Sequence, residues 1–144
     1  MKNINSLVSA ERKLMNKDNV PACQSDIGCV IVTFNRLNKL KLTLGHYADQ
    51  TLLPRYVIVV NNASTDGTKE YLDAWKEHSD GFSKIVIHSS ENLGGSGGFY
   101  LGEQAAIAQD ASWIMIADDD AYPSKHYIEG MQSYINTHDK DDIS

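Results

Sequence analysis

Short apolar runs separated by polar segments fill most of this chain. Four of these runs have the length and composition of strands: residues 27–34 (IGCVIVTF), 56–60 (YVIVV), 84–89 (KIVIHS) and 113–117 (WIMIA). The first is a continuous, largely β-branched run, which is typical of a strand covered on both faces.

Between these runs, apolar residues recur at helical spacing. Helices are predicted within residues 37–50, 69–78 and 99–111, and a fourth is expected from near Ser124, with Pro123 in its first turn. The residues that recur at this spacing are Leu37, Leu40, Leu44 and Tyr47; Tyr71, Leu72 and Trp75; and Leu101, Ala105 and Ala108. The last helix is expected to bury Tyr127, Met131 and Tyr134 or Ile135.

The alternation of strands and helices, with short connections, predicts a mainly parallel sheet. We expect residues 26–144 to form one domain, a Rossmann-like three-layer α/β/α sandwich. Residues 1–25 are polar and weakly patterned, and are expected to be an N-terminal extension that is either loose or forms a short helix around Leu7 to Leu14. Sheets of this class bind ligands outside the carboxyl ends of their strands.

Composition and charge narrow the classes of function. The 144 residues are 42% hydrophobic, enough for one domain with a core. A formal net charge of -6 disfavours a nucleic-acid partner, because such proteins normally have a basic face. No apolar run approaches the roughly 18 residues of a membrane span, and the N-terminus lacks the apolar centre of a signal peptide, so a soluble, unexported chain is expected. Cys23 and Cys29 are too few for a disulfide framework or a zinc site, and Cys29 is predicted to be buried.

Polar segments of unusual composition follow each predicted strand. They are TFNR at residues 33–36, NNASTDGT at 61–68, SSENLGGSGG at 89–98 and DDD at 118–120. Because ligands of parallel α/β sheets bind at the carboxyl ends of the strands, these segments are the candidates for a binding site.

The acidic triplet directly follows an apolar run. A solvated loop, or a cap for the helix near Ser124, would explain it, although one Asp would suffice for a cap. Three adjacent carboxylates repel one another unless a cation gathers them. Asp118 and Asp120 are therefore predicted to turn toward one divalent metal ion, which substrate phosphate oxygens would complete.

The segment NLGGSGG places four glycines within five positions. A hinge or a turn would account for its composition. Between a strand and a helix, however, the absence of Cβ atoms lets a ligand approach the backbone, and the N–H groups at the helix start favour an anion. The spacing is neither that of the dinucleotide fingerprint nor that of a P-loop.

The two remaining segments allow structural or binding roles. Ser64 or Thr65 is expected to cap the second helix, with Asp66 favoured by the helix dipole. The Asn61 amide can both donate and accept, which suits recognition of the edge of a base. Arg36 either pairs with a phosphate or caps a surface.

Taken in order, VIVTFNR, VIVVNNASTDGT, NLGGSGGFYLG and WIMIADDDAYP resemble the nucleotide-sugar half of a family 2 glycosyltransferase with the GT-A fold, over about Ile27 to Tyr134. The glycine-rich motif is similar to that of the galactofuranosyltransferase and rhamnosyltransferase-like branch. The resemblance implies sugar transfer from a UDP- or dTDP-linked donor to a glycan or lipid-linked acceptor, with inversion at the anomeric carbon. It also implies a role in polysaccharide biosynthesis and a cytoplasmic location at the inner face of the membrane.

The resemblance also assigns site residues. Thr33, Asn35 and Arg36 match the loop that contacts the nucleobase and the diphosphate. Asn61 stands where the family usually has an Asp that accepts from N3–H of uracil or thymine. The contacts beneath the ribose and the diphosphate would be Asn92, Gly94, Gly95, Gly97 and Gly98.

The acidic triplet matches the D-x-D motif of the family. The resemblance implies that Asp118 and Asp120 hold Mg²⁺ or Mn²⁺, and that Asp119, together with Asp118, contacts the sugar nucleotide. The ion would neutralise the charge that grows on the departing nucleotide.

The chain departs from the family by stopping at Ser144, before the half that binds the acceptor and supplies the catalytic base. The base is therefore expected beyond Ser144, and the chain is expected to be a fragment that carries the donor site and self-associates through exposed apolar surface. One rival interpretation is a non-catalytic nucleotide-binding module. The other is a phosphoryl-transfer α/β domain, which usually has acidic residues after its first strand, where this chain has TFNR.

Overall fold

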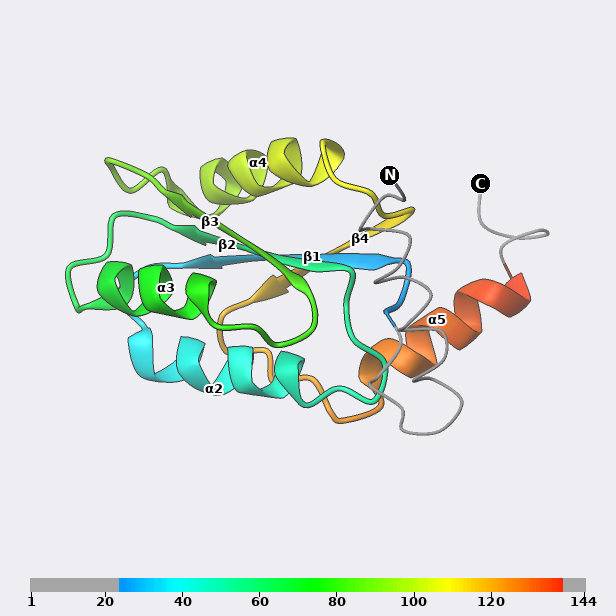
Figure 1. Ribbon diagram of the computed structural model, residues 1–144. Coiled ribbons are helices and arrows are strands. Elements are labelled where there is room, and N and C mark those ends of the chain that lie inside the picture. Colours follow the sequence, from blue (N-terminus) through cyan, green and yellow to red (C-terminus); the bar gives the residue numbers. More distant parts are fainter. Residues whose placement is uncertain (1–23, 139–144) are drawn as a thin grey trace, which may run out of the picture.

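The computed structural model describes residues 24–138. Its strands are β1 (Ile27–Thr33), β2 (Tyr56–Asn61), β3 (Ser83–His88) and β4 (Trp113–Asp118), and its helices are α2 (Leu37–Ala48), α3 (Thr68–Glu77), α4 (Gly94–Ile107) and α5 (Tyr127–His138). The strands form one parallel sheet in the order β3-β2-β1-β4, between two layers of helices (Figure 1). The predicted Rossmann-like α/β fold is confirmed.

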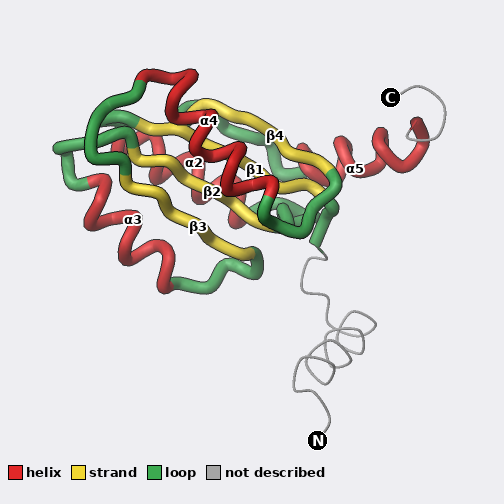
Figure 2. The backbone as a smooth tube through the Cα atoms, turned by 90° about the horizontal axis from the view of Figure 1, so that it is seen from above, coloured by secondary structure: helices red, strands yellow, loops and turns green. Residues whose placement is uncertain are grey.

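Helices cover the two faces of the sheet unequally. On one face α4 crosses β1 and β2 (Figure 2), where Val30, Ile58 and Val60 form an apolar cluster with Ala106. On the other face α2 and α3 cover a larger cluster, which α5 completes with Ile128 and Ile135. Within residues 24–138, no helix is both long and apolar enough to span a membrane.

The contact between α4 and β1 depends on glycine. A Cβ atom at Gly102 would lie 2.3 Å from Val30 Cγ1, and one at Gly98 would lie 2.6 Å from Val32 Cγ1. Both distances are below van der Waals contact, so only glycine lets the helix backbone lie this close to the strand. The first half of α4 is thereby fixed at the carboxyl end of β1.

The two central strands are buried, and the outer strand β4 is open on one face. Every residue of β2 is buried, and β1 is buried at all positions except Val32, which is half-buried. In β4 the side chains alternate, and Ile114 and Ile116 are 40% and 49% exposed. The cause is the position of α4, which lies over β1 and β2 and leaves the same face of β4 largely uncovered.

Cys29 is buried in β1, as predicted, whereas Cys23 and the stretch from Leu7 to Leu14 lie outside the described residues.

Two helices begin at different residues from those predicted. Helix α4 begins at Gly94 rather than near Phe99, so that the glycine-rich segment is the first turn of the helix. Packing against β1 outweighs the low helix propensity of glycine. Helix α5 begins at Tyr127, and Pro123 lies ahead of it rather than in its first turn.

The buried side of α5 agrees with the prediction at Ile135, one of the two alternatives given, and differs at Ile128, which is buried in place of Tyr127. Ile128 and Ile135 are buried, Met131 is half-buried, and Tyr127 and Tyr134 are 45% and 56% exposed. The pairs 127/134 and 128/135 have the same seven-residue spacing, so periodicity does not distinguish them. The core selects the β-branched aliphatic pair and leaves the tyrosine rings at the surface.

The loops after β1 and β2 are joined by hydrogen bonds. Asn35 N donates to Ser64 Oγ at 2.9 Å, and Thr65 N donates to Asn35 Oδ1 at 2.7 Å. Ser64 therefore bonds to the neighbouring loop. The prediction that Ser64 or Thr65 caps α3 is wrong, because neither side chain caps this helix. These bonds also hold Asn35 in a left-handed conformation with φ of 50°, which is uncommon for a residue other than glycine.

Asp66 links the starts of two helices. Its carboxylate accepts hydrogen bonds from the backbone N–H groups of Leu37 (3.0 Å) and Thr68 (3.2 Å), the first residues of α2 and α3. Burial opposes ionisation of this carboxyl group, but the hydrogen bonds from Thr68 and Leu37 outweigh it and lower the pKa of Asp66.

Replacing Asp66 with Ala is expected to lower the free energy of unfolding by about 1 to 2 kcal/mol near neutral pH, because two helix starts lose an acceptor. Since the pKa of Asp66 is lowered in the folded state, its stabilisation is present above the ordinary value of 3.8 and is lost as the pH falls through the lower folded pKa. Urea unfolding of the wild type and of Asp66→Ala, at about pH 7 and about pH 3, measures the difference in their free energies of unfolding. If this difference is as large at about pH 3 as at about pH 7, the ionised carboxylate of Asp66 is not what stabilises the helix starts.

Candidate functional site

A hollow of about 310 Å³ lies at the carboxyl ends of β1 and β2, beside the first turn of α4. We call it the strand-end hollow. Each of the four polar segments that follow the strands contributes to its lining, which consists of Val32, Thr33, Phe34, Arg36, Asn62, Asn92, Gly94, Gly95 and Asp119. The strand register brings these segments together, since Thr33 pairs with Asn61 and Val32 pairs with Asp118.

Asp119 is the buried member of the acidic triplet, with 4% of its surface exposed. Its Oδ2 accepts a hydrogen bond from Thr33 Oγ1 at 2.8 Å, and its Oδ1 accepts one from Arg36 Nη1 at 3.3 Å. Its backbone carbonyl accepts from Thr43 Oγ1 at 2.6 Å. Asp119 therefore fastens the end of β4 to both β1 and α2.

Arg36 and Lys39 neutralise one side of the triplet. Arg36 Nη1 lies 3.0 Å from Asp120 Oδ2, and Lys39 Nζ lies 3.9 Å from the same oxygen. The hydrogen bond to Asp119, and the charges of Asp119 and Asp120, raise the pKa of the Arg36 guanidinium above its ordinary value. Arg36 also lines a neighbouring hollow of about 420 Å³, together with Asn35 and Lys39.

Asp118 lies in a different environment from the other two carboxylates. It lines a separate hollow of about 530 Å³ with Ile116, Tyr122 and Tyr127. Among the described residues, no cation forms an ion pair with the Asp118 carboxylate, and no group of three or more His, Cys, Asp and Glu side chains is arranged to hold a metal ion. The two carboxylates predicted to share a metal ion thus differ in their surroundings, since Asp120 pairs with Arg36, and the metal site stays a prediction.

Asn62 holds the glycine-rich segment against β2. Its Nδ2 donates to the carbonyl of Gly94 at 2.8 Å, and its Oδ1 accepts from Leu93 N at 3.0 Å. The residue is buried, with 2% exposed. Asn92 Oδ1 accepts from Gly94 N at 2.9 Å. The backbone of Gly94 and Gly95 is left open to a ligand, because no side chain lies within 4 Å of where their Cβ atoms would be.

The other two predicted glycines do not line this hollow. Gly98 packs on Val32, and Gly97 packs on Leu93. The structure assigns them a packing role within and beneath α4.

Asn61, predicted to read the base, does not line the strand-end hollow. Its Nδ2 lies 3.1 Å from His88 Nδ1, and its Oδ1 accepts from Ser64 N at 3.1 Å. His88 Nε2 in turn lies 2.8 Å from Asp73 Oδ1. The side-chain amide of Asn61 is thus engaged on the opposite side of the strand from Asn62.

Sequence reasoning missed Asn62 and Phe34 as site residues. Strand alternation could have identified Asn62. Ile58 and Val60 face α4, so the side chain two residues further on, that of Asn62, also points toward α4 and contacts the glycine-rich segment. Phe34 directly follows β1 and is 43% exposed. An aromatic residue in a polar strand-end segment is the signal that would have identified it.

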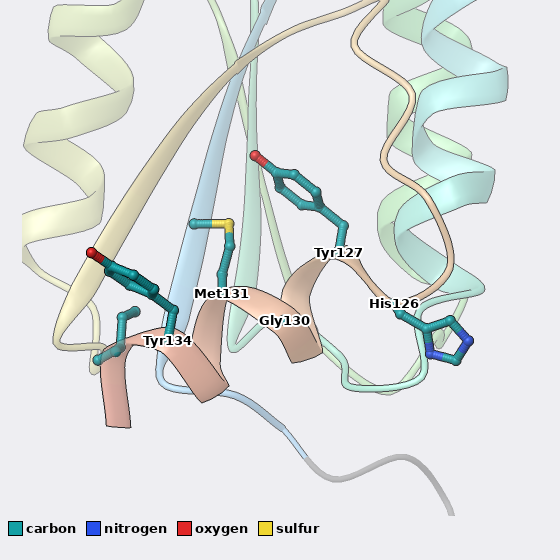
Figure 3. A pocket seen from close by; sticks show the side chains of 6 residues that line it. His126, Tyr127, Gly130, Met131 and Tyr134 are labelled. Atoms are coloured by element: carbon teal, nitrogen blue, oxygen red, sulfur yellow. The ribbon is translucent and has the colours of Figure 1, made fainter. Parts of the chain in front are cut away.

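A separate hollow of about 440 Å³ lies on α5 (Figure 3). The rings of Tyr127 and Tyr134 and the side chain of Met131 project on the same side of the helix. Its surface is almost entirely apolar, and none of its residues belongs to the strand-end hollow.

The model of the family described as glycosyl transferase family 2 matches residues 29–144. Curated relatives include a galactofuranosyltransferase, GlfT1, of Mycobacterium tuberculosis, which is 38% identical over 65% of this chain and 30% of its own length. The GlfT1 protein of Mycolicibacterium smegmatis is 33% identical over 80% of this chain and 37% of its own length. The chain thus spans about a third of the length of these relatives.

Solved structures share the fold. Staphylococcus aureus TarS 1-349 in complex with UDP aligns with a TM-score of 0.67 and 20% identity, over 78% of this chain and 32% of that one. The mannosyltransferase PcManGT of Pyrobaculum calidifontis, in complex with GDP-Man and Mn2+, aligns with a TM-score of 0.58 and 24% identity, over 82% of this chain and 35% of that one.

Proposed function

Because this chain belongs to glycosyl transferase family 2, we propose that its strand-end hollow binds the nucleoside diphosphate of a sugar donor, UDP- or dTDP-linked, for transfer of the sugar. The observation that carries the proposal is the composition of the hollow. An exposed aromatic ring, the open start of α4 and a guanidinium group all line it. The UDP and UDP-GlcNAc complexes of TarS, which has the same fold, support a nucleotide donor.

Each of these features suits one part of the ligand. The ring of Phe34 offers a face on which a base can stack. The N–H group of Gly95, at the start of α4, favours the diphosphate, because the helix N-terminus carries partial positive charge. Arg36 adds a donor fork that matches phosphate oxygens.

The transfer proposed from the family resemblance inverts the anomeric carbon. An acceptor hydroxyl, on a glycan or a lipid-linked glycan, attacks that carbon from the face opposite the diphosphate, and the bond to the nucleotide oxygen breaks. We assign no base among the described residues and propose that it lies outside them. Mg²⁺ or Mn²⁺, where bound, would stabilise the leaving diphosphate. The role of Asp118 and Asp120 in holding the ion stays a prediction, and we assign the ion no step. The acceptor, the cytoplasmic location and self-association also stay predictions.

Calorimetric titration with UDP and with dTDP tests the donor site, and Asn62→Asp is the informative variant. We expect one of the two nucleotides to bind, and the variant to bind it at least about tenfold more weakly. The reason is that a carboxylate oxygen in place of Nδ2 would face the Gly94 carbonyl at 2.8 Å, where two acceptors repel, and the glycine-rich segment would move.

Asn61→Asp is the matched control, since it makes the same substitution one residue away, outside the hollow. Its nucleotide affinity is expected to stay within about twofold of the wild type. A change in affinity of more than about twofold in either direction in Asn61→Asp, without weakening in Asn62→Asp, would return base recognition to Asn61. Absence of binding by the folded wild type would refute the donor site.

A further inference from the structure

The hollow on α5 continues the apolar core to the surface of the molecule. Met131 and Ile135 line it and also pack in the larger apolar cluster. The rings of Tyr127 and Tyr134, which line it too, are about half exposed (Figure 3). With a volume of about 440 Å³ the hollow can take several aliphatic side chains, and within residues 24–138 it is open to solvent.

Gly130 lies among these side chains, inside a helix, where glycine lowers stability relative to alanine. Its φ is not positive, and no described atom lies within 4 Å of where its Cβ atom would be. Neither the backbone nor the packing of residues 24–138 therefore requires glycine here. On an apolar helix face, a residue without a side chain lets another element approach the backbone closely.

The chain that precedes β1 arrives beside this helix. Asp26 N donates to Gln132 Oε1 at 2.7 Å, so the backbone is fixed to α5 one residue before β1 begins. Residues 16–25, when extended, span up to roughly 33 Å, whereas a helix as long as α5 measures only about 18 Å. Residues 4–15 can therefore reach every part of the hollow.

Residues 4–15 have the sequence pattern of a helix with one apolar side. The apolar residues at helical spacing are Ile4, Leu7, Val8, Leu14 and Met15. The run lies between Asn3 and Asn16, which suit the two ends of a helix. Glu11 falls on the same side, where the hydroxyl groups of Tyr127 and Tyr134 offer it donors. A helix of this length is marginal in water by itself and needs a surface on which to pack.

We propose that residues 4–15 form a helix that packs in the hollow on α5 of the same chain, with its closest approach at Gly130. The segment that follows α5, residues 139–144, contains one apolar side chain, that of Ile143, among three aspartates, and so does not suit the hollow. A second copy of the chain could offer the same N-terminal segment, and the test distinguishes the two cases. The proposal is independent of nucleotide binding, because no residue of this hollow lines the strand-end hollow.

Hydrogen–deuterium exchange of the full chain, read by mass spectrometry over residues 4–15, tests the packing. Because the helix is stable only when packed, its amides are expected to exchange at least about tenfold more slowly than those of a free peptide of the same sequence. This slowing is expected to disappear in Leu7→Asn, which places an amide on the apolar side. It is also expected to disappear in Gly130→Gln, whose side chain would take up space in the hollow.

Two control variants match these substitutions. Ser9→Asn changes the polar side of the same segment, and Gly45→Gln makes the glutamine substitution in α2, where no atom lies within 4 Å of the Cβ position. Both are expected to keep the slow exchange of the wild type. Exchange of the wild-type segment at the free-peptide rate, or slow exchange that survives Leu7→Asn, would overturn the proposal. Slow exchange that survives Gly130→Gln would overturn the assignment to this hollow.

The amides of β1 and β2 report in the same experiment whether each variant is folded. If Gly130→Gln alters their exchange, Leu7→Asn decides, since it changes no residue of the described fold. Repeating the wild-type measurement at about 1 μM and about 100 μM separates the two occupants. Packing within one chain gives equal exchange at both concentrations. Slow exchange that appears only at the higher concentration would place the segment on a second copy and overturn the proposal.

Discussion

Replacing Asp119 with Ala is expected to lower the free energy of unfolding by about 2 to 4 kcal/mol and to abolish nucleotide binding. The substitution leaves the hydroxyl of Thr33, which is 1% exposed, without its acceptor. It also removes the partner that orients Arg36 toward the strand-end hollow. Urea unfolding measures the first effect, and calorimetric titration with UDP and dTDP measures the second.

Asp118→Ala is the control within the same triplet. Asp118 is exposed, and no described cation pairs with it, so the free energy of unfolding is expected to change by less than about 0.5 kcal/mol. If the two variants lost the same stability, the structural role given to Asp119 would be wrong.

Gly102→Ala is expected to destabilise the fold by about 2 to 3 kcal/mol and to weaken nucleotide binding with it. The new methyl group would lie 2.3 Å from Val30 Cγ1 and 3.2 Å from Val60 Cγ2, both in buried strands. Helix α4 must then move away from the sheet, and its first turn carries the open backbone of Gly94 and Gly95. Thermal unfolding, followed by titration with nucleotide below the transition, measures both effects.

The control makes the same substitution in a helix where space is available. Gly45 lies in α2, and no atom lies within 4 Å of its Cβ position. Gly45→Ala is expected to stabilise the protein by about 0.5 to 1 kcal/mol, because alanine has the higher helix propensity. Destabilisation by Gly45→Ala, or tolerance of Gly102→Ala, would contradict the packing account.

The order of strands and helices could be predicted from the sequence because periodicity and turn residues agree along most of the chain. The buried positions Leu40, Leu44, Leu72 and Trp75 follow from the same periodicity. On α5, the choice of Ile128 over Tyr127 and of Ile135 over Tyr134 could not be made from the sequence, since both seven-residue pairs fit a helix and the choice depends on the rest of the core. The exposure of Ile114 and Ile116 depends likewise on where α4 lies, which strand composition does not encode.

For the candidate site, the sequence identified the segments that line the strand-end hollow but not the direction of each side chain. The choice between Asn61 and Asn62 depends on which face of β2 meets α4, and this is a property of the packed sheet. The acidic triplet shows the same limit. Its three carboxylates have three environments: Asp118 is exposed, Asp119 is buried on Thr33, and Asp120 pairs with Arg36. Side chains at adjacent positions of a strand, and of the turn that follows it, point in different directions.

The hydrogen bonds that join the loops after β1 and β2 have a consequence for the entropy of recognition. Asn35 bonds with Ser64 and Thr65 across the two loops, and Asp66 holds the starts of α2 and α3. The conformational entropy of the loops is therefore lost when the chain folds and not when a ligand arrives. Because the two loops are already ordered, even a small ligand that binds beside them retains most of its contact energy as affinity.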